Sequence, residues 1–233
     1  MKKFALVALL LGIGNCCLAE DPTGLAKHFV MVRGTSEPPG VSQFFPAVAI
    51  ESDGKNTILA TVSFGGELFP IGPKGKDVDR FHIVDSEESV ALLACDEKLG
   101  VSLFRVSSFV PPWPAYRVYA GELKANDKLQ WLQLDKRAFT GDLSKFTTVK
   151  TVGASLPYRT PQGQRVVVND TIVFEGKAPG QPGTFLLSDG KLAALYLNND
   201  ASGKLVRHAL TASSFMSGVS TLIAKTKAGR PAR

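Results

Sequence analysis

Three histidines could act as a general base in this chain, and they lie far apart in the sequence. His28, His82 and His208 have no second histidine and no cysteine close to them. Nucleophilic catalysis needs a base within hydrogen-bond reach of a hydroxyl or thiol, so the fold would have to assemble any such site. No spacing of His, Cys, Asp or Glu matches a zinc or calcium site, and no glycine-rich loop matches a nucleotide site. The sequence therefore predicts no metal and no other cofactor.

The first nineteen residues have the pattern of a secretory signal peptide. Lys2 and Lys3 precede an apolar run over 4–13, and Cys17-Leu18-Ala19 supplies the small-x-small pattern before Glu20. Residues 1–19 are therefore predicted to be removed during export from a bacterial cell. The alternative is a lipoprotein anchor on Cys16 or Cys17, which Asn15 disfavours because a lipoprotein signal has a small residue there. Export implies a periplasmic or secreted protein.

Removal of this leader leaves a mildly basic chain with one cysteine. Lys plus Arg falls from 27 to 25 against 21 Asp plus Glu, a net charge of +4, and only Cys95 remains. A lone thiol makes no internal disulfide, and its apolar neighbours predict a buried strand cysteine. The low charge, the 44% apolar content and the export signal argue against disorder and nucleic-acid binding. No later apolar run is long enough to span a membrane. The sequence therefore predicts neither a nucleic-acid partner nor a membrane span.

The elements that would position these side chains are strands. Short apolar or alternating runs recur about every ten residues from 29–33 to 205–209, separated by Gly, Pro, Asn and Asp. Asp53-Gly54 and Asp189-Gly190, each between apolar runs, predict hairpin turns. One helix is predicted over 213–226, with Thr211, Ser213 or Ser214 as its N-cap and an apolar face that packs onto the strands.

A proline cluster divides the strands into two groups. Pro111, Pro112 and Pro114 remove three backbone donors, so 111–114 is predicted to be a linker that crosses outside the strands. The expected organisation is a leader at 1–19, a first β-barrel at 27–110, the linker, and a second barrel at 115–212. The helix at 213–226 and a basic tail at 227–233 complete it. The fold class is all-β, with two six-stranded antiparallel barrels and a C-terminal helix.

Four segments in order resemble the trypsin-like serine protease family, in its bacterial HtrA-type form. Segment 49–64 is similar to the hairpin before the family's catalytic histidine, and 94–106 to the stretch that carries its aspartate. Segment 180–197 resembles the nucleophile loop and the hairpin after it. Segment 208–223 is similar to the final strand and helix. The resemblance implies a two-barrel fold, with no room in the chain for the PDZ domain that often follows.

The three catalytic positions of that family carry other residues here. The histidine position falls on Ser63, the aspartate on Gly100 and the serine on Pro182, so base, orienting acid and nucleophile are all replaced. The oxyanion loop corresponds to Gly180, Gln181 and Gly183. Because proline has no backbone N–H, Pro182 also removes one oxyanion donor.

The leading hypothesis is therefore a pseudoprotease, which binds a peptide or a partner protein without catalysis. The family's substrate pairs with a strand edge through main-chain hydrogen bonds, and this interaction needs no triad. A first alternative is a serine-type endopeptidase with a rearranged site that uses Thr184 or Ser188. A second is an unrelated exported β-barrel that binds a small ligand. The sequence names neither the partner nor the oligomeric state.

Overall fold

The structure is a computed structural model that describes residues 24–35, 42–62, 81–84, 86, 88–132, 145–159, 165–175, 182–199 and 206–228. The predicted leader and most of the predicted basic tail lie outside these residues, and the proposed domain bounds stay predictions. Within the described part of the chain, no helix is both long enough and apolar enough to cross a membrane.

The first half of the chain forms a six-stranded antiparallel sheet in the order β4-β1-β2-β3-β6-β5. A short 3-10 helix, η1 (Ala26–His28), leads into it. Its strands are β1 (Phe29–Thr35), β2 (Ser42–Ser52), β3 (Thr57–Val62), β4 (Phe81–Ile83), β5 (Ala91–Asp96) and β6 (Val101–Val106). Cys95 is buried in β5, as predicted.

The two end strands of this sheet meet. His82 in β4 forms an antiparallel bridge with Ser89, and the N–H of Val90 donates to the carbonyl of Phe81 at 2.8 Å. Since β5 begins at the next residue, the chain just before β5 pairs with β4. The first sheet therefore curls back on itself in the manner of a barrel.

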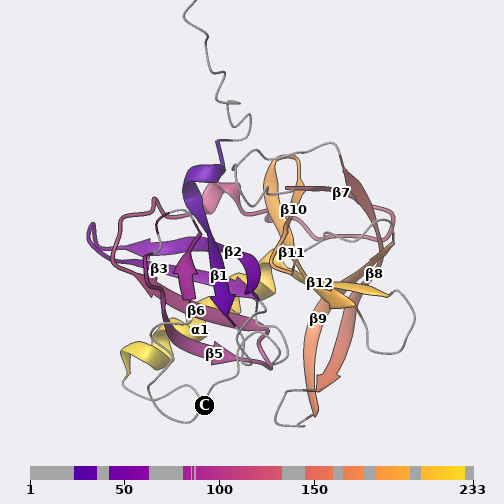
Figure 1. Cartoon of the computed structure of the whole chain (residues 1–233). Helices are drawn as coiled ribbons and strands as arrows, with labels where there is room; N and C mark the ends of the chain where they lie inside the picture. Colours follow the sequence, from indigo (N-terminus) through magenta and orange to yellow (C-terminus); the bar gives the residue numbers. More distant parts are fainter. Residues whose placement is uncertain are drawn as a thin grey trace, which may run out of the picture.

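The second half forms a closed antiparallel barrel in the order β10-β11-β12-β9-β8-β7. A second short 3-10 helix, η3 (Ala115–Arg117), precedes it. Its strands are β7 (Lys128–Trp131), β8 (Phe146–Arg159), β9 (Arg165–Glu175), β10 (Phe185–Ser188), β11 (Lys191–Asn199) and β12 (Arg207–Thr211). Figure 1 shows the two sheets side by side. The predicted fold class is confirmed.

Both predicted Asp-Gly sites form hairpins, by different means. Asp189 and Gly190 have φ values of 49° and 70° between β10 and β11, the pattern of a two-residue turn with both central residues left-handed. The turn between β2 and β3 is longer. There the Oδ1 atom of Asp53 accepts hydrogen bonds from the N–H groups of Lys55 and Asn56, at 2.8 and 2.6 Å.

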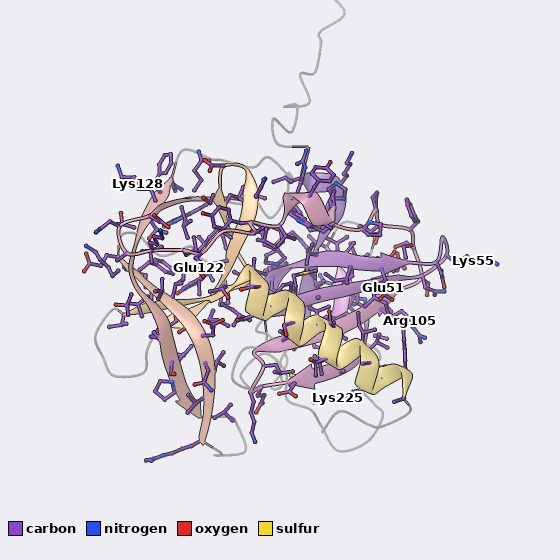
Figure 2. The ribbon with its side chains drawn as sticks, turned by 180° about the vertical axis from the view of Figure 1, so that it is seen from behind. Glu51, Lys55, Arg105, Glu122, Lys128 and Lys225 are labelled. Atoms are coloured by element: carbon purple, nitrogen blue, oxygen red, sulfur yellow. The ribbon has the colours of Figure 1, made fainter. Side chains whose placement is uncertain are left out.

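The C-terminal helix α1 (Ala212–Lys227) lies across the first sheet, as Figure 2 shows from behind. Thr211 is its N-cap and accepts a hydrogen bond from the N–H of Ser214 at 3.2 Å. Phe215, Val219 and Leu222 are buried, as the apolar face predicted. Lys225, near the helix end, forms an ion pair with Asp96 of β5 at 3.0 Å.

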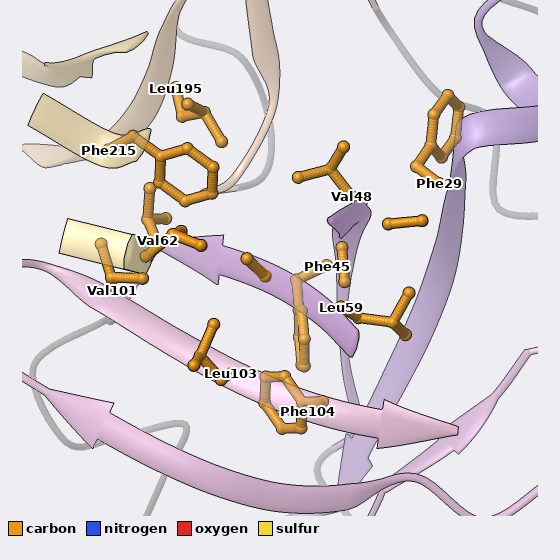
Figure 3. Close-up of a cluster of buried hydrophobic side chains, with 14 of the residues drawn as sticks. Phe29, Phe45, Val48, Leu59, Val62, Val101, Leu103, Phe104, Leu195 and Phe215 are labelled. Atoms are coloured by element: carbon orange, nitrogen blue, oxygen red, sulfur yellow. The ribbon is translucent and has the colours of Figure 1, made fainter. Parts of the chain in front are cut away.

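Two apolar clusters hold the sheets together. The larger cluster joins the first sheet to α1 and to the outer face of the second barrel, and Figure 3 shows Phe45, Phe104, Phe215 and Leu195 within it. The smaller cluster fills the second barrel. Strand β10 serves both, because Phe185 and Leu187 belong to the first cluster and Leu186 to the second. This is why β10 is apolar at successive positions.

The linker differs in one respect from the expectation. Residues 111–114 join no strand, but Trp113 is buried instead of lying outside. Its N–H donates to the carbonyl of Ala49 at 2.7 Å, and its ring packs edge-on against Phe185, with centroids 5.7 Å apart. His28 contacts the same ring and its Nδ1 lies 3.0 Å from the carbonyl of Pro111. The linker thus packs an aromatic side chain into the junction between the sheets.

Candidate functional site

The predicted site residues fall partly inside the described structure. Gly100, Pro182 and Gly183 are described, whereas Ser63, Gly180 and Gln181 lie outside the described residues. Both described parts of the site lie where the two sheets meet. Gly183 contacts β2 and β3 of the first sheet, and Gly100 contacts β9 and β12 of the second barrel.

Gly183 is pressed against the first sheet. Its φ is +81°, and a Cβ atom there would lie 2.9 Å from the Oγ1 of Thr61 and 3.2 Å from the carbonyl of Pro46. Thr61 Oγ1 is itself held by that carbonyl, to which it donates at 2.8 Å. Both the backbone conformation and the space therefore require glycine. Because Thr61 precedes Ser63 by two residues, this contact brings the loop that carries Pro182 to the end of β3.

The end of this loop offers few backbone donors. Pro182 has no N–H, and the N–H of Gly183 donates to the carbonyl of Tyr196 at 2.7 Å. The return bond runs from the N–H of Tyr196 to the carbonyl of Thr184 at 2.9 Å. The N–H of Gly183 is therefore used in the pairing of 183–184 with β11, and neither residue 182 nor residue 183 supplies a donor for an oxyanion.

Gly100 lies in an apolar environment with a backbone conformation that favours glycine. Its φ is +66°, and a Cβ atom would lie 3.2 Å from Val168 Cγ1 and 3.7 Å from Leu210 Cδ2. Val168 and Leu210 are buried members of the larger apolar cluster. An aspartate here would bring its carboxylate next to hydrocarbon, at a site that desolvates it, in a conformation that most side chains avoid.

The two residues that could serve as alternative nucleophiles do not lie together. Thr184 is 7% exposed at the entry to β10, while Ser188 is at the opposite end of the same strand, next to the hairpin turn. They are four positions apart along an extended chain, which corresponds to about 13 Å. Thr184 alone is therefore close to the loop of Pro182.

One hydroxyl and imidazole pair lies within hydrogen-bond distance, but it is sealed from solvent. Thr171 Oγ1 and His208 Nδ1 are 3.0 Å apart, on β9 and β12. Thr171 is fully buried and His208 is 4% exposed. Side chains alternate along a strand, so both residues face away from the interior residues Ile172 and Ala209, and a substrate could reach the pair only if the residues that cover this outer face moved. In the described part of the chain, no three His, Cys, Asp or Glu residues are grouped closely enough to hold a metal ion.

The barrel end next to Pro182 has features that the sequence analysis missed. Tyr196 is buried, and this burial raises the pKa of its phenol, while the charge of Arg207 acts in the opposite direction. Its ring packs edge-on against Phe174, with centroids 5.8 Å apart. The alternation of Arg207 with Ala209 along β12 was the available signal, because it places both side chains on the same face of the strand.

Strand β11 extends past its neighbour at this end. The described pairing on the β10 side ends at the Gly183–Tyr196 hydrogen bond, whereas on the other side Asn198 and Asn199 still pair with His208 and Arg207 of β12. Among the described residues, 197–199 thus have a strand partner on one side only. This edge lies beside the loop of Pro182.

Comparison with solved structures identifies the fold. No protein-family model matches the sequence, and no curated protein sequence matches it. The structure is similar to that of the Rv3671c protease from M. tuberculosis in its active form, with a TM-score of 0.60 and 14% identity over 100% of this chain and 96% of that chain. The HtrA-type protease AlgW, solved with a tripeptide, has a TM-score of 0.56 and 14% identity, over 89% of this chain and 64% of that one.

A third similar structure is that of Deg5, with a TM-score of 0.56 and 11% identity over 90% of this chain and 93% of that chain. At these identities the likeness concerns the fold. It agrees with the two antiparallel six-stranded sheets and the C-terminal helix described above. The chain therefore has the trypsin-like serine protease fold of the HtrA-type proteases.

Proposed function

We propose that this protein is an exported pseudoprotease that binds an extended segment of a peptide or partner protein and does not cleave it. The observation that carries the proposal is the state of the loop end at Pro182 and Gly183. It has no hydroxyl and no N–H at residue 182, and the N–H of residue 183 is engaged with Tyr196. A serine protease needs a hydroxyl and backbone donors at this place.

The aspartate position supports the same conclusion. Gly100 faces Val168 and Leu210, so its surroundings suit hydrocarbon and would desolvate a carboxylate. In a triad of this type, loss of the serine or the histidine alone lowers the rate by about a million-fold. In the proposal, Ser63, Gly100 and Pro182 replace the base, the orienting acid and the nucleophile, so all three catalytic groups are absent.

Peptide binding is supported by the edge of β11. An extended segment that pairs with 197–199 would gain main-chain hydrogen bonds without any catalytic group. AlgW, which has the same fold, was solved with a tripeptide. We infer that such pairing is the activity that remains when the catalytic residues are replaced.

Export is part of the proposal and rests on the leader. The pattern at Cys17-Leu18-Ala19 predicts that the protein begins at Glu20 and carries no lipid. The intact mass of the protein recovered from its native cell envelope or medium tests this. A mass that includes a diacylated Cys16 or Cys17 would replace the cleaved leader with a membrane anchor.

A fluorophosphonate probe for serine hydrolases tests the loss of catalysis. We expect no labelling of the wild-type protein, and none above background for Pro182→Ser, because that change restores a hydroxyl without a base at position 63. Labelling of the wild type that disappears in Thr184→Val would instead support the rearranged endopeptidase. Catalytically competent trypsin, labelled in parallel, confirms that the probe is reactive.

A further inference from the structure

Arg207 places a permanent positive charge at one end of the second barrel. It is the first residue of β12 and is directly opposite Phe174 of β9, which is buried inside the barrel. Two residues later, Ala209 belongs to the cluster that fills the barrel. Side chains alternate along a strand, so Arg207 faces the interior as Ala209 does. The residue is half-buried, so part of it is exposed to solvent.

The interior of the same barrel contains hydrogen-bond donors. The hydroxyl of Tyr196 is near enough to Arg207 for the guanidinium to act on its titration. The indole N–H of Trp131, on β7, is buried in the same cluster and has no hydrogen-bond partner within the described structure. An indole N–H can only donate. A group that accepts hydrogen bonds is the chemical complement of this interior.

The barrel end is next to the strand edge of the proposed peptide site. Arg207 is directly opposite Asn199, within the segment of β11 that extends past β10. Neighbouring strands are about 4.8 Å apart, so a peptide strand added to β11 would lie about 10 Å from β12. An arginine and a glutamate side chain that extend toward each other can close this gap. Alternate side chains of the peptide would face the barrel interior.

We propose that this barrel end, where Arg207 lies beside Tyr196, receives a carboxylate of the bound peptide and so selects segments with an acidic side chain. This inference rests on the proposed function, and it names the class of partner. A half-buried guanidinium favours a carboxylate through charge-assisted, bidentate hydrogen bonds. It disfavours lysine or arginine at the same peptide position, because like charges would meet in a partly desolvated site.

The test starts from a library of random ten-residue peptides, displayed on phage and selected on the immobilised full-length protein. We expect the selected sequences to be enriched in Asp or Glu at one position. One selected peptide is then synthesised in three forms: unchanged, with the acidic residue replaced by its amide, and with an amidated C-terminus. The amide replacement should weaken binding by about tenfold. C-terminal amidation should have little effect, since we assign the carboxylate to a side chain.

Variants of the protein test whether Arg207 recognises the negative charge of the peptide. Arg207→Gln should bind the acidic peptide and its amide form equally, whereas Arg207→Lys should keep part of the preference. Arg105→Gln is the matched control, because it removes an exposed guanidinium from β6 of the first sheet and should leave the preference unchanged. Thermal unfolding of each variant confirms that it is folded.

The experiment distinguishes a failure of acidic selection from a failure of peptide binding. Selected peptides without an acidic preference, or a preference that persists in a folded Arg207→Gln, would overturn this inference and leave peptide binding intact. A tenfold loss caused by C-terminal amidation alone would also overturn it, since the carboxylate would then come from the chain end. If no peptide is selected at all, the proposed function itself fails.

Discussion

Gly183 joins the loop of the candidate site to the first sheet, and two physical effects restrict it to glycine. Its φ is +81°, and a Cβ atom would lie 2.9 Å from Thr61 Oγ1. Gly54 provides a comparison with one effect only, because its φ is +87° and nothing lies within 4 Å of a Cβ atom there. The pair separates backbone strain from steric contact.

We expect Gly54→Ala to lower the free energy of unfolding by about 1–2 kcal/mol, the cost of the left-handed conformation. Gly183→Ala should lower it by about 2–4 kcal/mol, because the clash with Thr61 and Pro46 adds to that cost. Urea unfolding of both variants measures the difference. Equal losses would mean that the loop is not pressed against β3 as described.

Asp53 makes the stability of the β2–β3 turn depend on pH. Hydrogen bonds from the N–H groups of Asn56 and then Lys55 hold the pKa of its carboxyl below its usual value. A group with a lowered folded-state pKa contributes fully above its unfolded-state pKa, about 3.9, and loses that contribution as pH falls through the folded-state value. Asp53→Asn should therefore destabilise the protein at neutral pH, by an amount that shrinks below pH about 4. Urea unfolding from pH 7 to pH 2 tests this, and a pH-independent difference would contradict it.

Helix α1 is the element that covers the first sheet, and its attachment depends on one face. Leu222 is fully buried, whereas its neighbour Thr221 is exposed. Leu222→Ala should lower the free energy of unfolding by about 2–5 kcal/mol, because it removes buried hydrocarbon and leaves a cavity. Thr221→Ala should change it by less than about 0.5 kcal/mol. Similar effects of the two changes would show that the helix is not packed through Leu222.

The elements themselves could be predicted because their signals are local. Asp189-Gly190 fixes a two-residue turn by its own conformational preference, and the spacing of Phe215, Val219 and Leu222 defines a helix face within eight residues. The burial of Trp113 could not be predicted in the same way. The prolines around it correctly predicted a break in the strands, but its ring contacts come from η1 and β10, which are distant in the sequence.

In the candidate site, too, local features could be predicted from the sequence and contacts between distant residues could not. Residue identities at Gly100 and Pro182 could be compared with a family pattern, and that comparison predicts that the catalytic groups are replaced. The contact between Gly183 and Thr61 joins residues more than a hundred positions apart, so no local signal could indicate it. The sequence indicated that Arg207 shares a strand face with Ala209, and the register of β12 against β9 showed that this face points into the barrel. The geometry around Ser63 stays a prediction.

At the scale of the whole molecule, the chain has the architecture of the trypsin-like proteases, with its two sheets packed against each other. Phe185 packs against Phe29 of the first sheet, with ring centroids 5.4 Å apart, and against Trp113 of the linker. These aromatic contacts join the two sheets to each other and to the linker. Because Phe185 begins β10 shortly after Pro182, this packing anchors the end of the Pro182 loop at the junction of the two sheets.

The most direct test of this account is to incubate the protein with a random ten-residue peptide library and to measure peptide masses over time. Peptides retained by the protein and those left in solution are both analysed by mass spectrometry. The proposed binding of extended chains without a nucleophile or base predicts a retained set of peptides whose masses are unchanged, and no accumulation of fragments. Fragments that accumulate with time, and that no longer form when Thr184 is replaced by valine, would contradict the account.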